Sequence, residues 1–111
     1  MIVAGGCHCG LVRFEASVPG PALEVRACAC SRCRMTGHLH LLVPETRFRL
    51  VEGQRETSSY RFASGKARHV FCSQCGVESF FRPAAPAGMM SINYRCLDED
   101  QGLSATILPL D

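Results

Sequence analysis

Polar and apolar residues alternate along residues 11–18 of the chain. Val12, Phe14 and Ala16 fall on one side of this alternation, and the polar or charged residues between them fall on the other. A two-residue period of this kind is typical of a strand with one buried face. Residues 19–21 read Pro-Gly-Pro, which predicts a turn that ends the strand.

Further short apolar segments, bounded in several places by Gly and Pro, predict a series of strands along the rest of the chain. They are residues 23–27, 40–43, 48–51, 59–63, 67–71, 79–82, 89–94 and 103–108. One segment, residues 31–36, has helical character and is closed by Gly37. Ten Gly, six Pro and no Trp also favour short strands and turns over long helices. We therefore predict a mainly β fold of short antiparallel strands.

The length and charge of the chain narrow the possibilities further. Its 111 residues contain no internal repeat, linker or low-complexity tract, which predicts one domain spanning residues 1–111. A domain of this size buries a modest core, and a metal ion that joins distant segments would strengthen it. The formal net charge of +2 and the lack of a dense basic stripe argue against a nucleic-acid partner.

The N-terminal residues bear on the cellular compartment. Residues 1–6 are too short and too uncharged for a signal peptide, and no apolar run approaches the roughly 18 residues that a membrane span requires. We therefore expect a cytoplasmic protein without a membrane partner. Thiols stay reduced in that compartment, so we expect the eight cysteines to bind metal rather than to form disulfides.

Two pairs of cysteines, Cys7 with Cys9 and Cys72 with Cys75, lie far apart in the sequence, and each pair is followed by Gly. Residues i and i+2 of a strand project to the same side, and a C-x-x-C turn also brings its two thiols together. A Gly after the second Cys permits a positive φ and lets backbone N–H groups approach the sulfur. We predict that the four thiolates hold one structural metal ion. Two unrelated pairs, or a disulfide, are the alternatives.

A third group of cysteines, Cys28, Cys30 and Cys33, offers three thiolates within six residues. Three protein ligands with one exchangeable position is the arrangement of a catalytic zinc, so we predict an open, catalytic zinc site here. One alternative is a closed structural site, and another is a metal-free redox pair. The candidates for the fourth ligand of a closed site are Cys96, His38 and His40.

Other polar residues have a functional and a structural interpretation. Arg26, Arg32 and Arg34 flank the three-cysteine run, where they can offset thiolate charge and capture an anionic ligand through bidentate carboxylate contacts. A solvated basic face is the alternative. Cys96 stands alone and is expected to be a small buried residue. For the four histidines we favour a solvated, packed or supporting role over direct chemistry.

Taken together, these motifs resemble the glutathione-dependent formaldehyde-activating enzyme family, which has the Mss4-like β fold. The resemblance covers most of the chain, and the combination of its spacings is highly specific. Its motifs are Gly6-Cys7-His8-Cys9-Gly10-x-Val12-Arg13-Phe14, Cys28-x-Cys30-Ser31-x-Cys33-Arg34-x-x-Gly37, Phe71-Cys72-x-x-Cys75-Gly76, Ile92-Asn93 and Leu97-Asp98. One departure is Ala29, which stands where the family often has His and removes a polar neighbour from the site.

The resemblance implies a role for each group of cysteines. The structural zinc ligands would be Cys7, Cys9, Cys72 and Cys75, and the catalytic zinc ligands would be Cys28, Cys30 and Cys33. The implied activity is of the carbon–sulfur lyase type, a reversible condensation of glutathione or a similar thiol with formaldehyde or another small aldehyde. Arg32 and Arg34 would then bind the carboxylates of glutathione.

Two classes of function follow from these motifs. In an enzyme, a thiol at the middle zinc ionises at neutral pH and attacks a carbonyl carbon. The alternative is a non-catalytic, zinc-stabilised Mss4-like binding module, which a fourth protein ligand at the middle site would favour. A zinc ribbon is a weaker candidate, because ribbons place two C-x-x-C pairs about 15–20 residues apart and this chain does not.

Overall fold

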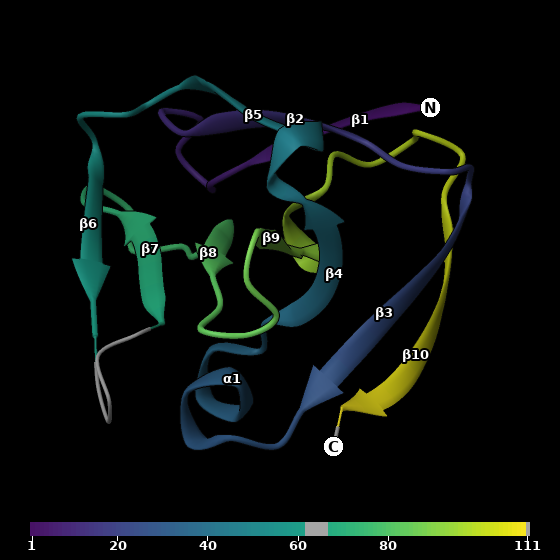
Figure 1. The fold of residues 1–111 in the computed structure, drawn as a ribbon. Helices are drawn as coiled ribbons and strands as arrows, with labels where there is room; N and C mark the ends of the chain where they lie inside the picture. The colour runs from purple at the N-terminus through teal and green to yellow at the C-terminus, as the bar shows by residue number, and fades with distance from the viewer. Residues whose placement is uncertain (62–66, 111) are drawn as a thin grey trace.

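A computed structural model describes residues 1–61 and 67–110 of the protein. These residues form two β-sheets, one short α-helix and two 3₁₀ helices. Figure 1 shows the smaller sheet across the top of the molecule, the larger sheet below it and the α-helix at the lower end. The mainly β fold predicted from the sequence pattern is therefore confirmed.

The smaller sheet consists of three antiparallel strands in the order β1-β2-β5. Their bounds are β1 (Ile2–Gly6), β2 (Arg13–Ser17) and β5 (Phe48–Glu52). Along β2, Phe14 and Ala16 are buried while Arg13 and Glu15 are partly exposed, as the alternation predicts. The smaller sheet thus presents one apolar face to the rest of the molecule.

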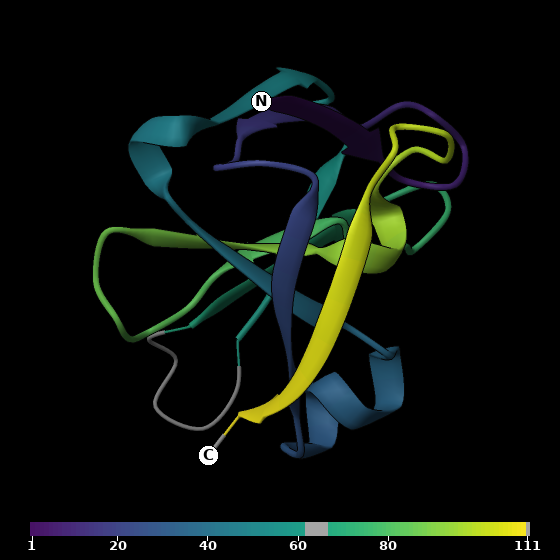
Figure 2. The same ribbon diagram turned by 90° about the vertical axis from the view of Figure 1, so that its right-hand side faces the viewer.

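The larger sheet has seven strands in the order β10-β3-β4-β9-β8-β7-β6. Their bounds are β10 (Ser104–Leu110), β3 (Ala22–Cys28), β4 (Leu39–Pro44), β9 (Met89–Asn93), β8 (Phe80–Arg82), β7 (Arg68–Cys72) and β6 (Thr57–Tyr60). All neighbours are antiparallel except β10 and β3, which lie side by side and parallel (Figures 1 and 2). The expectation of antiparallel strands is wrong for this pair. Parallel strands need a long connection, which the chain between them supplies.

The helical elements are short. Helix α1 spans Ser31–Thr36, as predicted, and Gly37 closes it in the left-handed conformation with φ +74°. The two 3₁₀ helices are η1 (Glu45–Arg47) and η2 (Tyr94–Cys96). None of the helices in the described residues is long and apolar enough to span a membrane.

The predicted strands agree with the observed strands, except at a few strand ends and at the N-terminus. Strand β1 was not predicted, because Gly5 and Gly6 interrupt any regular alternation. The predicted strand at residues 59–63 overlaps β6, and its residues 62 and 63 lie outside the described residues.

An aromatic cluster joins the two sheets. Phe14 of β2 and Phe48 of β5 stack with ring centroids 5.7 Å apart. The Phe80 ring of β8 packs against both, at 6.4 Å from Phe14 and 4.9 Å from Phe48. Because Phe80 belongs to the larger sheet, these three rings pack the two sheets against each other within the shared core.

Strand β1 approaches η2 very closely at Gly5. A Cβ atom on Gly5 would lie 2.4 Å from the Cys96 carbonyl oxygen and 2.7 Å from the Phe14 ring. The close approach allows Gly5 to form an antiparallel bridge with Leu97. Only a residue without a side chain fits this position unless the backbone moves.

We therefore expect Gly5→Ala to lower the free energy of unfolding by about 1–3 kcal/mol, because the added methyl overpacks the contact. Gly20→Ala is the control, since no heavy atom lies within 4 Å of a Cβ built there. It should change stability by less than about 0.5 kcal/mol. Denaturant unfolding measures both, and equal losses would contradict the packing argument.

Candidate metal centres

The first pair of cysteines lies in a tight turn after β1. The Cys7 N–H donates to the Val12 carbonyl at 3.0 Å, and the Gly10 N–H donates to the Cys7 carbonyl at 3.2 Å. The Val12 N–H approaches the Cys7 sulfur at 3.3 Å. Gly10 has φ +84°, which confirms the left-handed turn predicted for a Gly after the second Cys.

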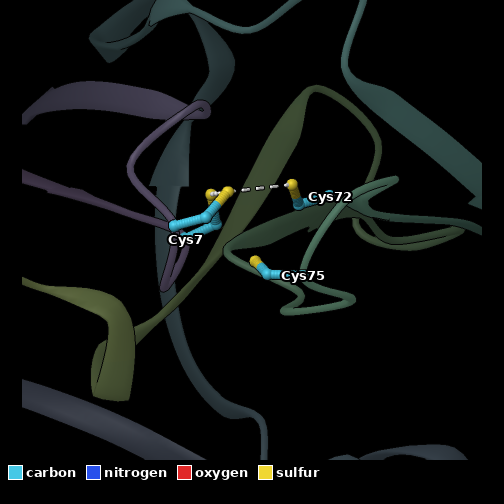
Figure 3. Close-up of side chains that lie close together, drawn as sticks. Cys7, Cys72 and Cys75 are labelled. Carbon is cyan, nitrogen blue, oxygen red and sulfur yellow. Dashed lines mark hydrogen bonds between the residues drawn. The ribbon is translucent and has the colours of Figure 1, made fainter.

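The second pair forms a matching turn at the end of β7. The Cys72 N–H donates to the Val77 carbonyl at 3.1 Å, and the Gly76 N–H donates to the Cys72 carbonyl at 2.8 Å. The Gln74 N–H approaches the Cys72 sulfur at 3.4 Å. Gly76 has φ +77°, so both turns have the same backbone design. Figure 3 shows Cys7 from the first turn and Cys72 and Cys75 from the second pointing toward one another.

The four sulfur atoms of these turns have the spacing of a tetrahedral metal site. All of them lie within 4.8 Å of one another. The Sγ atoms of Cys7 and Cys9 are 3.6 Å apart, and those of Cys9 and Cys72 are 3.7 Å apart. A tetrahedron with metal–sulfur bonds of about 2.3 Å has sulfur–sulfur edges of about 3.8 Å. The group can therefore hold a metal ion with little movement.

The turns also favour ionisation of one of the four thiols. Burial acts to raise the pKa of Cys75, but hydrogen bonds from the N–H groups of Val77 and Cys9 and from the Cys72 thiol lower that pKa to about 6. At Cys9 a hydrogen bond from the Leu11 N–H acts to lower the pKa, while burial and the neighbouring thiols raise it to about 12. Negative charge thus gathers on Cys75, which suits the binding of a cation.

The middle cysteines lie where β3 leads into α1. Cys28 is the last residue of β3, Cys30 is the N-cap of α1, and Cys33 is buried within the helix. The ligand atoms of Cys28, Cys33 and His40 lie within 4.8 Å of one another, so this second group can also hold a metal ion. The Cys33 sulfur is 3.2 Å from His40 Nε2, against about 3.6 Å for the corresponding edge of a tetrahedral zinc site.

Cys30, the remaining predicted ligand, lies beside this group. Its sulfur does not belong to the set of ligand atoms that all lie within 4.8 Å of one another. Its exposed sulfur accepts a hydrogen bond from the Cys33 N–H at 3.5 Å. Burial acts to raise the pKa of Cys30, but that N–H and the thiols of Cys33 and Cys28 lower it overall. By contrast, burial and the thiols of Cys30 and Cys28 raise the pKa of Cys33.

Among the candidate fourth ligands, only His40 belongs to the group. The Cys96 sulfur instead donates to the Glu78 carbonyl at 3.6 Å, and His38 Nε2 faces the Ser91 hydroxyl. Burial, with a smaller contribution from His38, lowers the pKa of His40 to about 4. His40 is therefore neutral at pH 7, which is the form that binds metals.

A buried chain of polar contacts leads away from the other ring nitrogen of His40. His40 Nδ1 is 2.8 Å from the Ser91 hydroxyl, which is 3.0 Å from His38 Nε2. His38 Nδ1 lies 3.5 Å from a carboxylate oxygen of Glu78. All four side chains are buried. Partners of this kind fix the orientation and tautomer of a metal-binding imidazole.

The chain ends at Glu78, whose carboxylate is surrounded by cationic or ionisable groups. Oε1 lies 3.3 Å from His69 Nδ1 and 3.8 Å from an Arg32 nitrogen. Burial acts to raise the pKa of Glu78, but the contacts with His38, Arg32 and His69 outweigh it and lower that pKa. Sequence reasoning missed Glu78 and Ser91. The detectable signal was an acidic residue within the otherwise apolar or neutral residues 77–81.

The three arginines near the middle cysteines differ in their surroundings. Arg32 turns inward to Glu78 and also lies over the Tyr60 ring, 4.9 Å from its centroid. Arg26 pairs with Glu24 on the surface of β3. Arg34 is exposed on α1. Of the two arginines predicted to bind an anionic ligand, Arg34 is therefore the one that faces solvent.

These features define a small, cysteine-rich β protein with two groups of side chains that can each hold a metal ion. The sequence model of the family described as "Glutathione-dependent formaldehyde-activating enzyme" matches residues 2–108. The chain belongs to this family, as its motifs indicated.

Two individual comparisons agree with this assignment. A Halomonas elongata protein with the provisional name of glutathione-dependent formaldehyde-activating enzyme is 37% identical over 84 residues, which are 68% of this chain and 52% of that protein. The chain thus spans about half the length of this curated relative. A crystal structure of a Rhodobacter sphaeroides protein superposes with a TM-score of 0.80 at 26% identity, covering 93% of this chain and 99% of that one.

If the outer four thiolates hold one ion, Cys72→Ser should remove about one metal equivalent and unfold most of the protein. Structural zinc contributes about 10 kcal/mol or more of binding free energy, which is comparable to the whole stability of a small domain. Cys96→Ala is the control, because its sulfur belongs to neither group of ligand atoms in the described residues. Elemental analysis and circular dichroism measure the outcome. A folded Cys72→Ser protein with full metal content would rule out this centre.

Burial, only partly offset by Glu78, lowers the pKa of His69 in the folded protein, which makes stability depend on pH. Below about pH 6.5 the unfolded chain takes up a proton at His69 more readily than the folded one, so stability falls on acidification. We expect this fall to be smaller in His69→Gln than in the wild type. Other titrations, which are common to both proteins, cancel in this comparison. Urea unfolding at pH 7, 6 and 5 measures the slopes, and a His69→Gln slope equal to that of the wild type would contradict the prediction.

Proposed function

We propose that the chain is a zinc-dependent enzyme of the carbon–sulfur lyase type, which adds a thiol to a small aldehyde and catalyses the reverse cleavage. The observation that carries this proposal is the position of the middle group. Cys28, Cys33 and His40 line a cavity of about 300 Å³, so an ion held there would face a space that a substrate can enter. Family membership supports glutathione as the thiol and formaldehyde as the aldehyde.

The donors suit zinc in both places. Four thiolates at tetrahedral spacing are typical of a structural zinc, and two thiolates with one imidazole are among the ligand sets of catalytic zinc. When bound at the middle group, zinc would supply a Lewis acid that favours the thiolate form of an incoming thiol. We take residues 1–111 as one zinc-binding domain on this basis.

The chain's own residues position the reactants. Ser91 holds His40 so that Nε2 points toward Cys33. Phe81, Pro83 and Pro86 form part of the wall of the cavity beside these ligands. In the addition, a bond forms between the thiol sulfur and the carbonyl carbon while the carbonyl π bond breaks. The carbonyl oxygen receives the proton that the thiol gives up, so the reaction needs no oxidant or reductant.

Binding of the thiol substrate involves the exposed cation of α1. Glutathione carries two carboxylates, and the exposed Arg34 directly follows Cys33 on α1. Bidentate contacts between guanidinium and carboxylate are strong and directional. Because both the protein and its substrate require free thiols, we assign the reaction to a reducing compartment such as the cytoplasm.

A binding module without catalysis is the second candidate. Cys30 lies close enough to Cys33 for a hydrogen bond from the backbone N–H to its sulfur. A small movement of Cys30 would give the ion a fourth protein ligand, and a closed zinc has no place for substrate. Zinc would then stabilise a surface for a partner rather than a reaction.

The two candidates differ in the behaviour of variants at the middle group. We expect Cys28→Ala and Cys30→Ala to lower thiol-dependent aldehyde turnover at least about 100-fold, because metal-ligand environments tolerate little change. Both variants should remain folded, since the outer four cysteines are intact. Turnover is measured from adduct formation by NMR, with Cys96→Ala as the matched control. A Cys28→Ala protein that lacks its second metal ion but retains turnover would refute the enzyme proposal.

A further inference from the structure

The cavity beside the middle group is largely apolar. It has a volume of about 300 Å³, and its lining consists of the three middle cysteines, His40 and His69, together with Leu42, Ala67, Phe81 and residues 83–86. Among the described residues that line it, none is Asp, Glu, Lys or Arg. A lining of this composition favours an apolar occupant and disfavours a charged one.

The size of the cavity exceeds what formaldehyde requires. A water molecule occupies roughly 30 Å³ in the liquid, so the cavity could take about ten waters. Formaldehyde has only two heavy atoms and would leave most of this volume unfilled. A cavity with apolar walls gains binding energy only from the surface that its ligand covers.

Glutathione does not account for the cavity either. Its two carboxylates and its ammonium group would lose their hydration on entry, and the described lining residues offer them no charged partner. The peptide is therefore better placed outside, near the exposed Arg34, with only its sulfur reaching the centre. The rest of the cavity is then available to the aldehyde.

We infer that the cavity binds the apolar substituent of the aldehyde, so that the preferred substrates are aldehydes with an alkyl chain or aromatic ring rather than formaldehyde. This inference rests on the proposed thiol–aldehyde reaction and specifies its substrate class. The carbonyl carbon lies toward the cysteine side, and the substituent packs on Leu42, Phe81 and residues 83–86. Each methylene buried there is worth about fourfold in binding.

The test compares hexanal with formaldehyde, using glutathione and the metal-loaded protein. NMR exchange spectroscopy measures the rate of adduct formation catalysed by the protein. We expect kcat/KM for hexanal to exceed that for formaldehyde at least tenfold. In Leu42→Ser this ratio should fall about tenfold, because a polar group replaces part of the wall. Leu50→Ser is the matched control, because Leu50 is also half-buried but lies outside the cavity, and it should keep the wild-type ratio.

The outcomes separate this inference from the proposed function. Equal or better turnover of formaldehyde, with a ratio that Leu42→Ser leaves unchanged, overturns the inference and leaves the thiol–aldehyde reaction standing. Catalysis of neither aldehyde overturns the proposed function. In that case NMR titration with 1-hexanol, an unreactive apolar analogue, still tests whether the cavity binds an apolar ligand. Shifts confined to residues around Leu42 and Phe81 support apolar binding there, and their absence overturns it.

Discussion

The structure depends first on the closure of the Cys7–Cys9 turn against the Cys72–Cys75 turn. One turn connects β1 to β2 of the smaller sheet, and the other ends a strand of the larger sheet, so a shared ion would tie the sheets together. The aromatic cluster of Phe14, Phe48 and Phe80 also links the two sheets. Because the four thiolates come together only in the folded chain, the binding free energy of an ion there would add to the stability of a protein with a small core.

In the proposed function, the second group of donors would bind an ion that takes part in the reaction. Its ligands come from the end of β3, from α1 and from β4, and only the larger sheet brings these together. His40 is held by Ser91 and, through His38, by Glu78. A rigid set of donors beside an apolar cavity is what we expect of a reaction site, whereas the outer group is closed by its own two turns.

The sequence predicted the strands and the outer group better than the details of the middle group. The cysteine spacing and the Gly that follows each pair are local features. They allowed the Cys7–Cys9 turn and the Cys72–Cys75 turn to be paired from the sequence alone. Strand β1 could not, because its glycines serve a close approach to η2 that has no local signal. The parallel pairing of β10 with β3 and the positions of His40, Ser91 and Glu78 depend on sheet register, which sequence pattern does not determine.

The central claim is that the cysteines divide between two separate metal centres of different composition. NMR of protein in which ¹¹³Cd replaces the native metal tests it most directly, because the cadmium resonance position depends on the number of sulfur ligands. The account predicts two resonances, one from a four-sulfur site and one from a site that also has a nitrogen ligand. A single resonance, or no tightly bound cadmium in the reduced protein, would contradict it.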